Sequence, residues 1–157
     1  MSEELKNFLG PELLGMWADG DRLMASASGG FHDYSFVIFP FAKVYEGFLK
    51  KFFLKLGAIN EHQYNSDHWR VGKALNPQLE KELRHESVYD FLKPELGNIL
   101  WQAWKEGRNR IFHYFPGQHQ PLTFEKAQTI ILQINEAMEM AIDSIKMGNE
   151  QYSMGNK

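Results

Sequence analysis

The stretch that decides the fold runs from Asp33 to Leu56 and reads DYSFVIFPFAKVYEGFLKKFFLKL. Its apolar side chains recur every three or four residues, which is the spacing of one face of an α-helix. They are Val37, Phe41, Val44, Tyr45, Phe48, Phe52 and Leu56. Asp33 can cap the N-terminus, Pro40 either starts the main helix or kinks it, and Gly57 is a natural stop. The stretch therefore predicts a long amphipathic helix.

The chain before this stretch is also helical in pattern, but it is interrupted. Residues 2–18 predict a short helix that breaks near Gly10 and Pro11, a pair that usually marks a turn. Residues 19–32 are rich in Gly, Ser and Ala, and we expect a loop there.

The chain after this stretch predicts three more helices. Residues 58–76 have no clear period, whereas residues 77–92 and a segment from Pro94 to about Phe115 are expected to be helical. Thr123 can cap a last helix, and from Gly148 onward the end of the chain is expected to fray. The last helix carries a long apolar stripe, made of Phe124, Ala127, Ile131, Ile134, Met138, Ala141 and Ile145.

The expected fold is therefore all-α: a bundle of four main helices with a short N-terminal helical extension. No strand alternation and no internal repeat stands out in the sequence. We expect residues 1–32 to form the extension, residues 33–147 a single helical domain, and residues 148–157 a flexible tail. The length of 157 residues suits one compact domain, because chains tend to divide only beyond roughly 250 residues.

The composition excludes several classes of protein. Seventeen basic and twenty acidic side chains give a net charge of -3, which argues against gripping nucleic acid through bulk positive charge but leaves room for a local RNA site. There is no cysteine, so disulfides, thiol chemistry and thiolate metal sites are absent. The acidic start and the absence of an apolar run of about 18 residues predict a cytoplasmic protein without a membrane span.

The segment with the strongest candidates for catalytic side chains is WKEGRNRIFH, from Trp104 to His113. On an ideal helix Arg108 falls within the core stripe, so it must snorkel, find a carboxylate or face an interface. Asn109 and His113 are four residues apart and share the opposite, polar face. Arg108 and His113 are about 140° apart on that wheel, so a site that uses both needs Arg108 to reach around the helix or a second copy of the chain.

These three residue types suit the cleavage of a phosphodiester. Arginine offers a planar fork of donors to phosphate oxygens, and histidine can exchange a proton with a ribose oxygen near neutral pH. Asparagine can orient the histidine or the substrate. Such a set can cleave RNA without a metal, with the ribose 2′-hydroxyl as the nucleophile.

The run from Arg108 to His113 resembles the R-N-x-x-x-H signature of HEPN domains, which are all-α bundles and often ribonucleases. The upstream segment PFAKVYEGFLK, residues 40–50, looks like a helix of the RNase LS-type toxins of toxin–antitoxin systems, in which a basic residue stands three before an acidic one. This resemblance covers residues 33–147 and adds Lys43 and Glu46 to the candidate site.

The resemblance implies a metal-independent endoribonuclease that forms a homodimer, with the two motifs facing each other. It implies that Arg108 neutralises the phosphate, that His113 is the general acid and base, and that Asn109 polarises or orients the reacting groups. It also implies that Glu46 holds Arg108 in place or assists the proton transfer. It also implies a toxin or defence role, with an antitoxin protein as a partner and no cofactor.

Other residues have a functional and a plainer interpretation. Lys43, Arg110 and Tyr114 are candidates for contacts with RNA, but Glu46 and Lys43 also fit an exposed helix surface. The basic run from Lys50 to Lys55 could follow an RNA backbone or simply be solvated. No histidine pair has the spacing of a known zinc motif, so no metal site is predicted.

Two further functions compete with the ribonuclease. One is a HEPN module without cleavage activity that binds nucleotide or RNA, or pairs with a nucleotidyltransferase-type antitoxin. The other is a plain dimerisation or adaptor bundle. Arg108 and His113 converging in an open cleft would favour the enzyme, whereas Arg108 fully buried against Glu46, with His113 alone on a surface, would favour the adaptor.

Overall fold

The structure is a computed structural model that describes residues 1–27, 29–83, 87–114, 116–117 and 120–154, and every regular element among them is helical. The expected all-α class is therefore confirmed. The long runs are α1 (Glu3–Ser26), α2 (Ser35–Lys55), the continuous run of α6 (Pro94–Trp104), η3 (Lys105–Asn109) and α7 (Arg110–Phe112), and α8 (Phe124–Met154). The short elements are α3 (Glu61–Asn65), α4 (Val71–Ala74), α5 (Glu80–Leu83) and the 3-10 turn η2 (Tyr89–Phe91).

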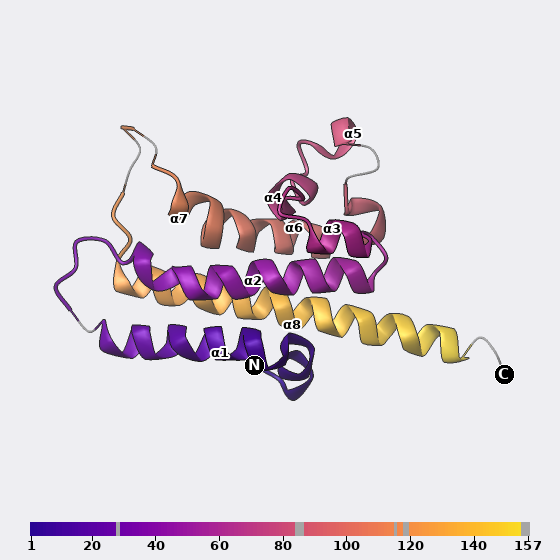
Figure 1. The fold of residues 1–157 in the computed structure, drawn as a ribbon, viewed down its shortest axis with the longest axis horizontal. Coiled ribbons are helices and arrows are strands. Elements are labelled where there is room, and N and C mark those ends of the chain that lie inside the picture. The colour runs from indigo at the N-terminus through magenta and orange to yellow at the C-terminus, as the bar shows by residue number, and fades with distance from the viewer. Residues whose placement is uncertain (28, 84–86, 115, 118–119, 155–157) are drawn as a thin grey trace.

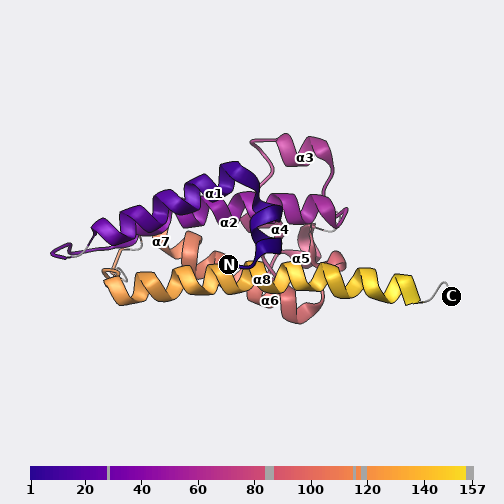
Figure 2. The same cartoon turned by 90° about the horizontal axis from the view of Figure 1, so that it is seen from below.

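The long runs alternate in direction along the chain and surround α2 (Figure 1). Helix α1 packs along one side of α2, the α6–η3–α7 run lies on the other side, and α8 contacts both α2 and α6. The C-terminal end of α8, drawn in yellow, extends past the rest of the bundle in both views (Figures 1 and 2).

Helix α2 is the centre of the core because apolar side chains surround it. A helix that is apolar on most of its circumference is stable only when neighbours cover it on several sides. Its buried residues are Val37, Ile38, Phe41, Ala42, Val44, Tyr45, Phe48, Leu49, Phe52 and Phe53. Gly57, with a φ of 73°, directly follows the C-terminal capping residue of this helix, so the expected stop is confirmed.

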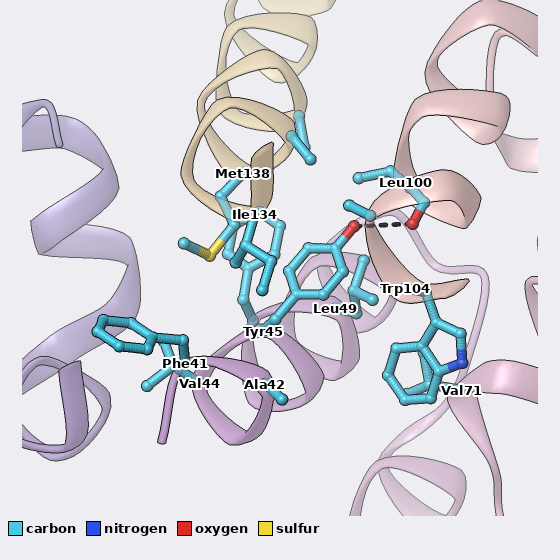
Figure 3. Packing of buried hydrophobic residues seen from close by; sticks show 14 of the residues in the cluster. Phe41, Ala42, Val44, Tyr45, Leu49, Val71, Leu100, Trp104, Ile134 and Met138 are labelled. Atoms are coloured by element: carbon cyan, nitrogen blue, oxygen red, sulfur yellow. Dashed lines mark hydrogen bonds between the residues drawn. The ribbon is translucent and has the colours of Figure 1, made fainter. Parts of the chain in front are cut away.

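Tyr45 joins α2 to α6 in the middle of the core. Its hydroxyl donates a hydrogen bond of 2.9 Å to the carbonyl of Leu100, and both side chains are fully buried (Figure 3). Burial raises the pKa of Tyr45 well above its ordinary value, because the phenolate would lose its hydration. The hydroxyl thus stays a donor and fixes the distance between the two helices.

Helix α1 bends at Gly10, whose φ of 76° and ψ of 173° are not helical, as the pair with Pro11 predicts. The break leaves carbonyl oxygens without helical partners. Lys51 of α2 donates hydrogen bonds of 2.7 and 2.9 Å to the carbonyls of Phe8 and Leu9, which satisfies them. This lysine of the basic run therefore has a structural partner.

The first turn of α1 is tied to α8 (Figure 2). The hydroxyl of Ser2 donates to Glu139 at 2.7 Å, and Glu4 forms an ion pair of 3.4 Å with Lys146. Two interactions lower the pKa of Glu4. The larger is a hydrogen bond from the backbone N–H of Glu4 itself, and the smaller is the ion pair with Lys146.

Two expectations about the helices are wrong. Helix α1 continues to Ser26 instead of ending near residue 18, because Gly20 lets it approach Phe41, where an added Cβ would lie 2.6 Å from the ring. The described part of residues 77–92 contains only the short α5 and η2 instead of one long helix. Between residues 77 and 87 only Leu79 and Leu83 are apolar, and a helix without a packed face is marginal in water.

None of the helices in the described part of the chain combines the length and the apolar character that a bilayer span requires.

Candidate functional site

The α6–α7 run changes its winding at the predicted site. Residues 105–109 form a π-helical turn, in which the N–H of Arg110 donates to the carbonyl of Lys105, five residues earlier. Gly107 is buried in this turn, and an added Cβ would lie 2.7 Å from Cδ1 of Ile134 on α8. Such turns are rare and recur at functional sites, so the sequence motif falls where the backbone is unusual.

The helical run then ends at Phe112, before His113. His113 has extended backbone angles, with a φ of -116° and a ψ of 131°. An ideal wheel therefore does not describe the relation between Arg108 and His113, because the π turn changes the rotation per residue and His113 lies outside the helix. The expectation that the helix continues to about Phe115 is wrong at residues 113–114, and Phe115 itself lies outside the described residues.

Arg108 is positioned from two sides. A guanidinium nitrogen lies 3.6 Å from a carboxylate oxygen of Glu46 on α2, and the guanidinium carbon lies 5.1 Å from the centre of the Trp104 ring. Trp104 is buried, whereas the Arg108 and Glu46 side chains are each 37% exposed. Arg108 is therefore paired with a carboxylate, and its guanidinium side chain is still partly exposed to solvent.

The surface beside Arg108 carries a basic and an aromatic side chain of α2. Lys43 lies three residues before Glu46 and is exposed. One turn earlier, Phe39 is 56% exposed and contacts Phe112 of α7 edge to face, with ring centroids 5.7 Å apart. We call Phe39, Lys43, Glu46, Arg108 and Phe112 the arginine face.

An open cleft of about 930 Å³ lies along the η3–α7 run, and Phe112 lines it as well as belonging to the arginine face. One wall is the η3–α7 run, the opposite wall is the first three turns of α8, and Asp33 and Ser35 of the α2 start close one end. The backbone N–H of Tyr34 donates to the carbonyl of Leu122 at 2.9 Å, which ties the start of α2 to the start of α8. Thr123 caps α8 by accepting from the N–H of Lys126 at 3.2 Å, as predicted.

The cleft divides the predicted site residues into two groups. Asn109, Arg110, His113 and Tyr114 line it, whereas Arg108, Glu46 and Lys43 do not. Arg110 is held by Glu106 through contacts of 2.8 and 3.1 Å, so its charge is largely balanced within the same turn of helix. His113 and Tyr114 are both exposed at the end of the wall that α7 forms.

Neither of the two arrangements anticipated from the sequence is found within one chain. Arg108 and His113 do not line the same cleft, and Arg108 is not fully buried against Glu46.

Sequence reasoning missed the wall of the cleft that α8 provides. Lys126, Thr129 and Gln133 are exposed, line the cleft, and follow one another at three- and four-residue spacing. Lys105 lines the opposite wall, four residues before Asn109. The signal in the sequence was this polar row beside the apolar stripe, but nothing in the sequence says that it faces the R-N-x-x-x-H motif.

Part of the basic run has a structural role, and the described residues contain no group suited to a metal ion. Lys50 donates to the carbonyls of Tyr64 and Ser66 at 3.2 and 3.1 Å, so this part of the basic run supports the α3 loop. Among the residues that the structure describes, no three His, Asp or Glu side chains are grouped so that they could hold a metal ion.

Comparisons of the chain with family models, curated proteins and solved structures found no match.

Proposed function

We propose that this protein is a metal-independent endoribonuclease that acts as a homodimer. The observation that carries the proposal is the state of Arg108: it lies in a π turn, contacts Glu46 and Trp104, and keeps 37% of its side chain exposed. An arginine that only stabilised the fold would have little reason to be held in place and left accessible at once. The R-N-x-x-x-H likeness to HEPN domains supports the same interpretation.

In this mechanism the ribose 2′-oxygen attacks the adjacent phosphorus and the bond to the 5′-oxygen breaks. The products are a 2′,3′-cyclic phosphate and a 5′-hydroxyl end. His113 in its neutral form takes the proton of the 2′-hydroxyl, and a protonated imidazole returns one to the leaving 5′-oxygen. Arg108 binds the phosphate oxygens as negative charge grows on them, and Asn109 orients the imidazole or the substrate.

The second copy of the chain is part of the proposal, because Arg108 does not line the cleft that His113 lines. A dimer with two-fold symmetry places the same surface of both copies together, so the arginine face of one copy can meet the His113 of the other. The exposed Phe39 and Phe112 give that surface an apolar part to bury. A toxin or defence role, restrained by an antitoxin protein, follows from the family likeness alone.

The test compares wild type with Arg108→Ala and His113→Ala on labelled single-stranded RNA in the presence of EDTA. We expect wild type to release 2′,3′-cyclic phosphate ends and each variant to be slower by roughly 10²- to 10⁴-fold. Arg22→Ala on α1 and His62→Ala on α3 are the matched controls, because both residues are exposed and outside the cleft and the arginine face. Full activity of His113→Ala, or a strict need for added metal, would contradict the proposal.

A non-catalytic dimerisation or nucleotide-binding module is the second candidate. The ion pair of Arg108 with Glu46 favours it, because that pair gives the arginine a partner without any substrate. If wild type and both variants are folded dimers and none cleaves RNA, this candidate replaces the enzyme.

A further inference from the structure

The cleft beside the R-N-x-x-x-H motif is lined by several residues that have no role in the proposed cleavage mechanism. Its floor is apolar, with Leu122 and Ile130 buried and Ile111 half-buried. Above this floor stand the amide side chains of Asn109 and Gln133. The cleft thus combines a small apolar patch, against which a flat ring can pack, with a larger number of polar side chains.

The charges of the cleft are arranged around two lysines. Arg110 is paired with Glu106 within η3 and α7. The side-chain ammonium groups of Lys105 on one wall and Lys126 on the other form no hydrogen bond or ion pair with another residue that the structure describes. Asp33 is the one lining carboxylate that Arg110 does not balance, so the two ammonium groups leave an excess of one positive charge in the cleft although the whole chain carries a net charge of -3.

We propose that this cleft binds a nucleotide of single-stranded RNA, with a phosphate between Lys105 and Lys126 and the base over the apolar floor. Gln133 and Asn109 can then form hydrogen bonds with the edge of the base. A base in a duplex is stacked and paired, so only an unpaired base can enter a recess between helices. Half of the residues that line the cleft are exposed, so a nucleotide can enter it from solvent while the rest of the strand stays outside.

This inference rests on RNA as the substrate of the proposed function, and it adds a site that the motif does not contain. His113 stands on the η3–α7 wall of the same cleft. A nucleotide held here would lie beside the imidazole, and its neighbour along the strand would continue toward the arginine face of the second copy. Lys105, Lys126 and Gln133 would therefore determine which strand and which base reach the reactive phosphate.

The test measures binding separately from cleavage. The probe is a short fluorescent single-stranded RNA with 2′-O-methyl groups, which has no free 2′-hydroxyl and cannot be cut. We expect Lys105→Gln/Lys126→Gln to bind at least about tenfold more weakly than wild type. The slope of log affinity against log salt should become shallower by about 0.7, because one neutralised phosphate is lost. Lys55→Gln/Lys93→Gln is the matched control, because both lysines are exposed, lie outside the cleft and change the net charge equally.

Two further arms separate this inference from the proposed function. His113→Ala, which removes the proposed proton-transfer group but no proposed phosphate contact, should lose cleavage of ordinary RNA but keep at least most of the affinity for the 2′-O-methyl probe. If wild type binds through the two lysines and never cleaves RNA, the ribonuclease proposal fails while the cleft proposal stands. If the cleft variant binds like wild type, or a duplex of the same sequence binds as tightly as the single strand, the cleft proposal is wrong.

Discussion

At the scale of single residues, Arg108 owes its position to a neighbour on another helix. Glu46 lies 3.6 Å away on α2, and the two side chains are equally exposed. Exposed ion pairs contribute little to stability, because water screens the charges and the long side chains lose freedom. The importance of Glu46 is therefore expected in activity more than in stability.

Glu46→Gln should separate these two effects. We expect the free energy of unfolding to fall by less than about 1 kcal/mol. RNA cleavage should fall by about ten- to a hundredfold, because the guanidinium loses the group that orients it. Urea denaturation and single-turnover cleavage measure the two quantities, with Glu136→Gln on the exposed side of α8 as the control. If Glu46→Gln equals wild type in both the free energy of unfolding and the rate of cleavage, Glu46 has no role beyond that of an exposed surface residue.

Two tyrosines give the fold a dependence on alkaline pH. Burial raises the pKa of Tyr45, and burial together with Glu80 raises the pKa of Tyr89 to about 12. The hydroxyls donate to the carbonyls of Leu100 and Leu75. Above a pH of about 10 the tyrosines ionise in the unfolded chain but stay protonated in the folded one. The unfolded state then binds fewer protons, so stability falls as the pH rises.

We therefore expect the free energy of unfolding to decrease steadily from about pH 10 to pH 12. Tyr45→Phe/Tyr89→Phe should be less stable at neutral pH, by about 1 kcal/mol for each lost hydrogen bond. It should also show a weaker decrease with pH. Urea denaturation at several pH values measures this, and an unchanged decrease in the double variant would assign it to other groups.

At the scale of the elements, the site depends on the contact between η3 and α8. Gly107 brings the π turn against Ile134 and Ile130, and a side chain at this position would collide with both. The same contact sets the distance between the two walls of the cleft, because η3 forms one wall and α8 the other.

Gly107→Ala should destabilise the protein by about 1–3 kcal/mol, as overpacking of a close contact does. The matched control is Gly15→Ala on α1, where an added Cβ meets nothing within 4 Å. That control should be neutral or more stable by up to about 1 kcal/mol, because alanine favours a helix over glycine. Thermal unfolding of both variants checks the prediction, which equal melting temperatures would contradict.

At the scale of the whole molecule, the separation of Arg108 from His113 makes the oligomeric state decisive. A site assembled from two copies has a consequence that no site within one copy shares. In a mixed dimer of Arg108→Ala and His113→Ala chains, one of the two sites keeps both residues and the other has neither. Two inactive proteins should therefore restore each other.

We expect a mixture of the two variants, exchanged as subunits, to recover about a quarter of the wild-type activity, since half of the dimers are mixed and half of their sites are intact. Sedimentation should show a dimer for wild type and a monomer for Phe39→Glu, which introduces a charge into the apolar part of the arginine face. Phe91→Glu is the control, because Phe91 is similarly exposed on η2. No recovery in the mixture, with exchange demonstrated, would place the site within one chain.

Much of the fold was determined by the sequence alone, because it depends on periodicity and local signals. The apolar spacing in residues 33–56 and 124–145 predicts α2 and α8, and Gly10, Gly57 and Thr123 mark a break, a stop and a cap that the structure contains. The composition of residues 19–26 was misleading, because Gly20 allows a close contact with Phe41 of α2 inside a helix instead of marking a loop. Residues 77–92 were misjudged for the opposite reason, since helix-forming residues without an apolar face gain little from packing.

The candidate site was decided largely by tertiary structure. The sequence placed Arg108, Asn109 and His113 in one motif and added Glu46 from another helix, because residue type and spacing are local properties. It could not show that His113 lines a cleft that Arg108 does not line, since the π turn and the end of the helix before His113 are not visible in the spacing of the residues. Nor could it bring Lys126 and Gln133 opposite the motif, because contacts between residues far apart in the chain exist only once the helices have packed.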